Sequence, residues 1–122
     1  MKKTTSDLTA NQPRLKQITN LALNKKAGKL IILDVRGLSS LADFFVICHG
    51  NSEPQVKAIA DSIRKGTNHK PRHIEGYDNQ NWILLDYFDV IVHVFKKDER
   101  EYYNLERLWA DAPCEEIDNE RN

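Results

Sequence analysis

The hydrophobic positions of this chain alternate between a helical period and short continuous runs, a pattern typical of a mixed α/β fold. A first helix is expected over about 12–26, where apolar residues recur at helical spacing after a proline. A second is expected over 52–66, because Ser52-Glu53-Pro54-Gln55 resembles a capping box ahead of an apolar stripe. The remaining apolar runs are short and rich in β-branched residues, and they predict five strands at about 30–35, 44–48, 72–75, 82–85 and 90–95.

The order of these elements predicts a single α/β domain with a mixed five-stranded sheet, two main helices and a short C-terminal helix. The link 87–89 is so short that the last two strands should be antiparallel. Apolar residues within 105–109 predict the closing helix. The domain is expected to span 11–110, between a flexible N-terminal tail at 1–10 and an acidic, flexible C-terminal tail at 111–122.

Composition narrows the class of protein. The 122 residues suit one domain, and the 18 basic and 18 acidic side chains give a formal net charge of zero. No apolar run approaches the ~20 residues of a membrane span, and no signal-peptide core follows Lys2 and Lys3, so a cytoplasmic protein is expected. Cys48 and Cys114 do not form the dense pattern of a disulfide scaffold, and both are expected to be free thiols.

One segment has a marked charge bias. Between His73 and Lys96 there is no Lys or Arg. The same segment holds four carboxylates around Trp82: Glu75, Asp78, Asp86 and Asp89. An acidic face with an aromatic centre repels phosphates and is complementary to a basic surface, so the sequence predicts a basic partner.

Each of these residues also has a structural interpretation. Trp82 begins a strand and could be a core residue, although indole rings are frequent among binding hot spots. Asp86 and Asp89 flank a turn, where carboxylates often bind only local backbone or water.

The sequence offers little support for catalysis or a metal site. Asp34 and Asp43 sit at strand ends and could form a catalytic pair, but turn or capping roles fit them better. His69 and His73 have helical ligand spacing, but Pro71 lies between them, so no metal is expected. The chain has no Asp-x-Asp pair, phosphate-binding loop or dinucleotide fingerprint, and neither a cofactor nor enzymatic activity is expected.

Three blocks of this sequence closely resemble the ribosomal silencing factor family, also called the Iojap family. The resemblance covers about 12–110. The blocks are Leu33-Asp34-Val35 with 39–47 and the start of the second helix; Glu75-Gly76 with 82–87 and 89–95; and 99–109.

The resemblance implies a binding protein that docks on large-subunit ribosomal protein fourteen and sterically blocks joining of the small subunit, repressing translation under nutrient limitation. It also implies a homodimer when free and a fold related to nucleotidyltransferases, so a nucleotidyltransferase-like enzyme is the alternative. The docking residues are expected to be Trp82, Asp86, Asp89, Glu75, Leu84 and Tyr87. The basic residues of the first helix offer a minor contact with ribosomal RNA as a supplement, although a solvated helix face explains them better: Arg14, Lys16, Lys25 and Lys26.

Two positions depart from the family pattern. Gln55 stands where the family usually has His, and Phe88 stands where it usually has Gly. Glycine would permit a positive φ, which Phe accommodates poorly, so either the turn differs here or it never needed that conformation. An exposed Phe88 would enlarge the docking surface; the alternative is that it folds onto the edge of the core.

Overall fold

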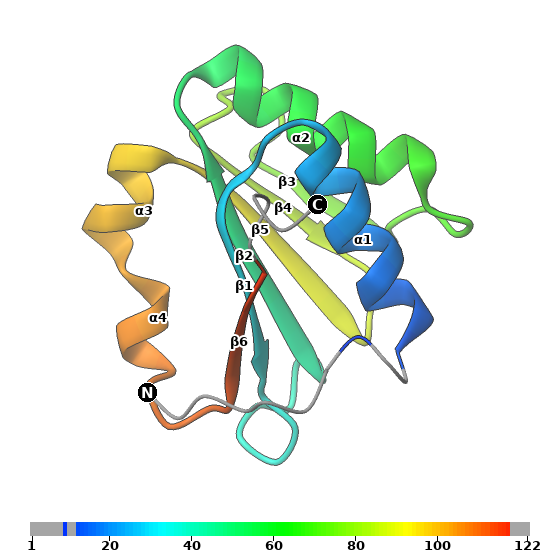
Figure 1. Cartoon of the computed structure of the whole chain (residues 1–122), viewed down its shortest axis with the longest axis vertical. Coiled ribbons are helices and arrows are strands. Elements are labelled where there is room, and N and C mark those ends of the chain that lie inside the picture. Colours follow the sequence, from blue (N-terminus) through cyan, green and yellow to red (C-terminus); the bar gives the residue numbers. More distant parts are fainter. Residues whose placement is uncertain (1–8, 10–11, 118–122) are drawn as a thin grey trace.

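A six-stranded mixed sheet forms the centre of the molecule, with helices on both faces (Figure 1). The computed structural model describes residues 9 and 12–117. The strand order is β3-β4-β5-β2-β1-β6, in which β2 and β5 are parallel and every other neighbouring pair is antiparallel. The strands are β1 (Gly28–Asp34), β2 (Phe44–Gly50), β3 (His73–Glu75), β4 (Trp82–Asp86), β5 (Val90–Lys96) and β6 (Cys114–Ile117).

Helices α1 (Pro13–Asn24) and α2 (Glu53–Gly66) cover one face of the sheet. Pro13 opens α1, where its missing N–H costs nothing. The hydroxyl of Ser52 caps α2 by accepting from the Gln55 backbone N–H at 3.3 Å. The buried faces of both helices pack on alternate residues of the strands, and this larger core contains Cys48.

Helices α3 (Lys97–Tyr103) and α4 (Leu105–Leu108) lie against the opposite face. A second core lies there, to which Leu105 and Trp109 contribute from the helical side. Cys114 belongs to this second core, so it is on the other side of the sheet from Cys48 and the two are not joined by a disulfide.

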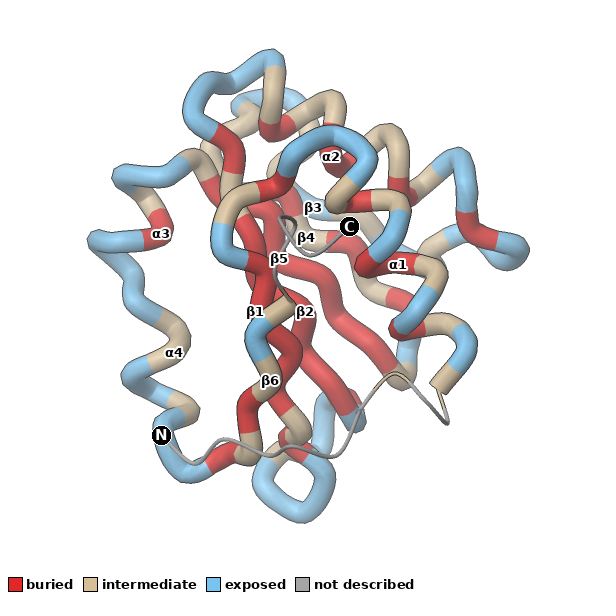
Figure 2. Tube along the Cα trace, in the orientation of Figure 1, coloured by how far each residue is buried: buried red, intermediate tan, exposed pale blue. Residues whose placement is uncertain are grey.

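The central strands are buried on both faces (Figure 2). In β5 six consecutive residues from Val90 are buried, and in β2 only His49 is less than buried. Strands covered on both sides have no solvent face, which is why these segments are continuous apolar runs and not alternating ones.

The predicted α/β class, the mixed sheet and the antiparallel β4–β5 pair are confirmed, but the strand count was wrong. The sixth strand, β6, lies in the segment predicted as a flexible tail and pairs with β1. Its sequence is polar because it is an edge strand with only Cys114 fully buried. The N-terminal tail, apart from Thr9, and residues 118–122 lie outside the described residues.

Two further boundaries differ from expectation. The closing helix is a pair, α3 and α4, divided by Asn104 in the left-handed conformation. Helix α1 ends at Asn24, earlier than predicted, because Lys26 has a positive φ of 61°. Within the described part of the chain, no helix is long and apolar enough to cross a membrane.

Gln55 joins the two long helices. Its side-chain oxygen accepts from the Asn51 backbone N–H at 2.7 Å, so the capping box is displaced by one residue from the expected form. Its side-chain nitrogen donates to the carbonyl of Lys26 at 3.2 Å, just beyond the end of α1. An amide can accept and donate at once, and this position uses both properties.

Candidate docking surface on strand β4

Strand β4 exposes one half-buried row of side chains on the face that also carries α3 and α4. Trp82, Leu84 and Asp86 alternate along the strand with the buried Ile83 and Leu85. Side chains two residues apart share one face of a strand, so the first three form a single row. We call this row, together with Glu75, the β4 face.

Glu75 joins the row from the neighbouring strand. It pairs with Leu84 across the antiparallel β3–β4 ladder, and directly paired residues lie on the same face. Four of the six predicted docking residues are therefore brought together: Trp82, Leu84, Asp86 and Glu75.

Trp82 is held by aromatic neighbours on three sides. Its ring stacks on Phe95 with centroids 4.6 Å apart and meets Tyr103 of α3 at 4.8 Å. Its indole N–H donates to Nδ1 of His93 at 3.1 Å. Both interpretations of Trp82 are thus partly correct, because the ring packs on the second core while remaining partly exposed.

The carboxylates of the β4 face have side-chain partners that lie at or outside the edge of the acidic segment. Asp86 contacts Arg72 at 3.3 Å and accepts from the Phe88 backbone N–H at 2.8 Å. Glu75 lies 2.8 Å from His73 and its side chain is 64% exposed, whereas that of Asp86 is 16% exposed. The face is therefore less acidic than the sequence suggests, and Glu75 carries its most accessible carboxylate.

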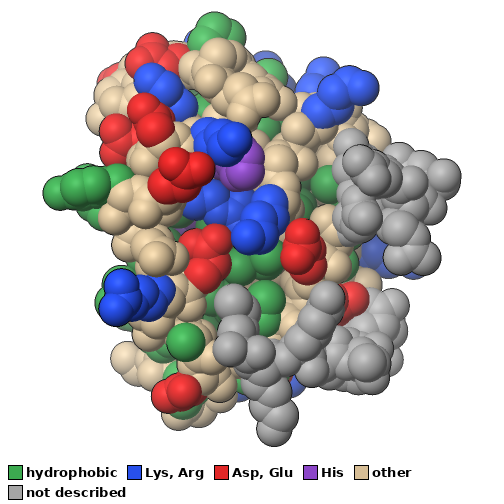
Figure 3. Space-filling view, turned by 60° about the vertical axis from the view of Figure 1, so that its left-hand side comes forward, with side chains coloured by type: hydrophobic (Ala, Val, Ile, Leu, Met, Phe, Trp, Pro, Cys, Tyr) green, Lys and Arg blue, Asp and Glu red, His purple; other side chains and the backbone are tan. Residues whose placement is uncertain are grey.

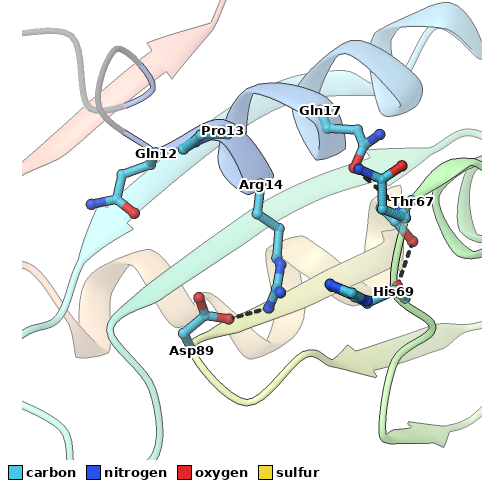
Figure 4. Close-up of a pocket in the computed structure, with 8 residues that line it drawn as sticks. Gln12, Pro13, Arg14, Gln17, Thr67, His69 and Asp89 are labelled. Atoms are coloured by element: carbon cyan, nitrogen blue, oxygen red, sulfur yellow. Dashed lines mark hydrogen bonds and ion pairs between the residues drawn. The ribbon is translucent and has the colours of Figure 1, made fainter.

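Asp89 points toward α1 and away from the β4 face. It forms a 2.6 Å ion pair with Arg14, which also donates to the Tyr87 carbonyl at 3.1 Å (Figure 4). The pair borders a hollow of about 460 Å³ that is also lined by Gln17 and His69. Asp89 therefore lies apart from the β4 face, because the residue is in the turn after β4 and not in the strand.

Tyr87 is buried in the core beneath the long helices. Only 4% of it is exposed, and its hydroxyl is 2.9 Å from that of Thr67 at the end of α2. Burial raises the pKa of the phenol. A side chain enclosed on the helical face cannot contact a partner at the β4 face, so we omit it from the docking surface.

Phe88 does adopt a positive φ, of 81°, in the turn between β4 and β5. The turn therefore keeps the conformation that favours glycine. Both explanations expected from the sequence, a different turn or a turn that never needed a positive φ, are wrong. The ring is 66% exposed, and the Arg72 guanidinium lies 4.8 Å from its centroid. Of the two expected placements, the exposed one is confirmed.

Neither a catalytic carboxylate at Asp34 nor a metal site is needed to explain the contacts that the structure describes. Asp34 binds Arg36 through a 2.7 Å ion pair, and this partner holds the pKa of the carboxyl below its usual range. It thus has the local role expected at a strand end, two residues from its partner. Among the described residues there is no group of three or more His, Cys, Asp or Glu side chains arranged to hold a metal ion.

The sequence did not identify Tyr103 or His93 as parts of this surface. Tyr103 is 45% exposed and packs on Trp82 only because α3 folds back over the sheet, which no local pattern reveals. The position of His93 could have been inferred from strand pairing. It faces Leu84 in the β4–β5 register and so lies on the same side of the sheet as Trp82.

Comparison with known proteins gives one consistent family. The family model described as "Ribosomal silencing factor during starvation" matches residues 8–122. The chain is 48% identical over 112 residues to ribosomal silencing factor RsfS of Halalkalibacterium halodurans, covering 89% of this chain and 96% of the relative. It is 32% identical over 113 residues to the chloroplastic protein Iojap of Arabidopsis thaliana, covering 87% of this chain and 48% of the relative.

Solved structures agree with the fold. A crystal structure of a Bacillus halodurans protein has a TM-score of 0.77 at 46% identity, covering 88% of this chain and all of the other. A Chromobacterium violaceum protein gives a TM-score of 0.78 at 32% identity, covering 81% of this chain and 85% of the other. Sequence and structure lead to the same conclusion: the chain belongs to the family of ribosomal silencing factors.

Proposed function

We propose that this chain binds the large ribosomal subunit through ribosomal protein fourteen, with the β4 face as the docking surface, and thereby blocks joining of the small subunit. The observation that carries the proposal is the partly exposed Trp82 of that face, in a chain whose family is described as silencing ribosomes during starvation. The effect is repression of translation when nutrients are limiting.

The composition of the β4 face suits a protein interface. Trp82 and Tyr103 provide aromatic area, and aromatic residues are enriched in the centres of interfaces. Leu84 adds an apolar side chain between Trp82 and Asp86. A large, partly exposed indole that is already fixed by its neighbours loses little conformational entropy on binding.

The carboxylates of the β4 face support a basic partner, but fewer of them are accessible than the sequence predicts. Glu75 is the accessible carboxylate, and Asp86 is shielded by Arg72. Ribosomal proteins are generally basic, so the Glu75 end of the face would steer association more than it would add affinity.

The proposed mechanism requires only that the chain occupy its binding site on the large subunit. The docking row lies on a strand paired on both sides, to β3 and to β5, and such a surface is rigid without its partner. A rigid surface can block a second subunit by excluded volume, without any chemical step. Two exposed lysines, Lys16 of α1 and Lys25 just after the helix, could make the lesser contact with ribosomal RNA, whereas Arg14 is occupied by Asp89. We also propose a homodimer when the chain is free.

Sedimentation with purified subunits tests this function. The protein should migrate with the large subunit and not with the small one, and the bound large subunits should fail to form complete ribosomes when small subunits are added. Binding to both subunits, or binding that leaves joining unaffected, would contradict the steric mechanism.

A further inference from the structure

A second hollow, of about 320 Å³, opens beside α3 on the same face of the sheet. Figure 3 shows Lys and Arg side chains gathered there around a histidine, with acidic side chains at the margin. The hollow lies at the carboxyl ends of the parallel strands β2 and β5, where ligands bind in many α/β proteins. It is lined by Lys29, His49, Lys97, Arg100, Glu101, Asn104 and Glu106.

A buried guanidinium forms the floor of this hollow. Arg100 is only 5% exposed, and its Nε and Nη2 lie 2.9 and 2.8 Å from one carboxylate oxygen of Glu106. Its Nη1 donates to the Gly28 carbonyl at 3.2 Å and lies 2.9 Å from Nδ1 of His49. A buried cation with several fixed partners is held in one position, so the neighbouring imidazole is fixed as well.

The contact with Arg100 determines which imidazole nitrogen can donate. A guanidinium only donates, so Nδ1 of His49 accepts, and Nε2 carries the proton of the neutral ring. Within the described part of the chain, no residue forms a hydrogen bond with Nε2 of His49. The ring is partly exposed, which leaves an N–H donor directed by Arg100 and available to a ligand.

Two ammonium groups also line the hollow. Lys29 and Lys97 are exposed, and among the described residues neither has a carboxylate partner. The pKa of His49 is lowered, first by burial and then by the charges of Arg100 and Lys97, with Glu101 and Glu106 opposing. Glu106 is paired with Arg100, and Glu101 adds a second carboxylate, so the lining holds three cationic side chains, Lys29, Lys97 and Arg100, against these two acidic ones.

The backbone around the hollow is unusual in a way that favours a functional role. Lys29 and Asn104 both have positive φ, of 38° and 50°, although neither is glycine. Gly28 is closely covered by the His49 ring, which a Cβ at this position would overlap. Non-glycine residues in this region are strained, and such strain is concentrated at binding and active sites.

We propose that this hollow binds the phosphate group of a small phosphorylated molecule, with His49 Nε2–H and the ammonium groups of Lys29 and Lys97 as its donors. Arg100 holds the imidazole and adds its charge from below. Apart from His49, no aromatic side chain is among the described residues that line the hollow, so it offers no stacking surface for a base. The site therefore recognises the phosphate and not the group attached to it.

Titration with inorganic phosphate at constant ionic strength, followed by the imidazole signals of His49 in NMR spectra, tests the site directly. We expect saturable shifts and a rise in the pKa of His49 in the bound state, because an adjacent anion stabilises the imidazolium. Adenosine monophosphate should compete, and adenosine should not. Absence of saturation, or equal competition by adenosine, would overturn the proposal.

A double variant, Lys29→Gln with Lys97→Gln, should weaken phosphate binding at least tenfold, while Lys65→Gln on the exposed side of α2 should leave it unchanged. An unchanged affinity of the double variant for phosphate would show that Lys29 and Lys97 do not bind it, and would overturn the proposed site. An RNA oligonucleotide without terminal phosphates should not displace phosphate; displacement would show that the site takes a nucleic-acid backbone instead. None of these measurements uses ribosomes, so their outcome is independent of the docking function proposed above.

Discussion

The indole N–H of Trp82 donates a hydrogen bond to Nδ1 of His93 over 3.1 Å, linking a partly exposed residue of the β4 face to a buried side chain in the next strand. The bond requires His93 to be neutral, with its proton on Nε2. Burial also favours the neutral ring, because it lowers the pKa of His93 to about 4. The β4 face thus rests on a neutral histidine enclosed by aromatic rings.

The free energy of unfolding should fall as the pH falls through the range between about 6.5 and 4. In that range the unfolded chain binds a proton at His93, while the folded chain, with its pKa near 4, does not. Stability is therefore highest above the unfolded pKa and decreases by roughly 3 kcal/mol across the range. Urea denaturation at a series of pH values measures this decrease.

A His93→Phe variant separates this contribution from that of His49, whose pKa is also lowered. The variant should be less stable at neutral pH, since Trp82 loses its acceptor, but its stability should depend less on pH. His69→Gln, at an exposed position, serves as the control. An unchanged pH dependence in His93→Phe would mean that the pKa of His93 is the same in the folded and the unfolded chain.

Gly76→Ala should destabilise the protein by about 2 kcal/mol or more. Gly76 has a φ of 75°, and an added Cβ would overlap the carbonyl oxygen of Trp82, which is backbone and cannot turn aside. Gly37→Ala is a matched control, because its φ is 81° but nothing lies within 4 Å of the added carbon. Equal losses in thermal stability would show that only φ matters at Gly76.

The periodic parts of the chain predicted the fold well because burial there follows a simple local pattern. Buried residues recur at helical spacing in α2, alternate along β4 and are continuous in β5. Strand β6 could not be predicted in the same way. It has one fully buried residue, Cys114, and its position depends on pairing with β1, which lies about 80 residues earlier.

The candidate site was predicted in part for a similar reason. Alternation along β4 places Trp82, Leu84 and Asp86 on one face, and the sequence contains that pattern. Counter-ions do not follow any local pattern: Arg14 reaches Asp89 from a helix 75 positions away. A charge count within one segment therefore overestimates the acidity of the surface.

Phe88→Gly should leave the protein about 1 kcal/mol more stable than Phe88→Ala. Both variants lose the contact with Arg72, but only alanine keeps a Cβ at a φ of 81°. The greater flexibility of glycine in the unfolded chain offsets part of this difference. Chemical denaturation of the two variants measures it, and an alanine variant as stable as the glycine variant would indicate that the turn can relax.

Glu75→Lys should slow association with the large subunit, and Asp89→Lys should not. Glu75 is the exposed carboxylate of the β4 face, whereas Asp89 is paired with Arg14 on the other side of the sheet. Charges near an interface mainly change the association rate, and their effect decreases as salt increases. Stopped-flow association at two salt concentrations distinguishes the variants, and equal slowing would restore Asp89 to the docking surface.

Trp82→Ala should weaken binding to the large subunit more than any other single change on the β4 face, by roughly 2 kcal/mol if the ring is a buried hot spot in the complex. Truncation also removes support from Phe95 and Tyr103, so lower stability must be separated from lost docking. Trp109→Ala is the matched control, because Trp109 packs on Phe45 in the same core but does not belong to the β4 face. Subunit joining should recover in Trp82→Ala in proportion to the lost binding and remain blocked in Trp109→Ala. A folded Trp82→Ala protein with full affinity and full inhibition of joining would show that docking uses another surface.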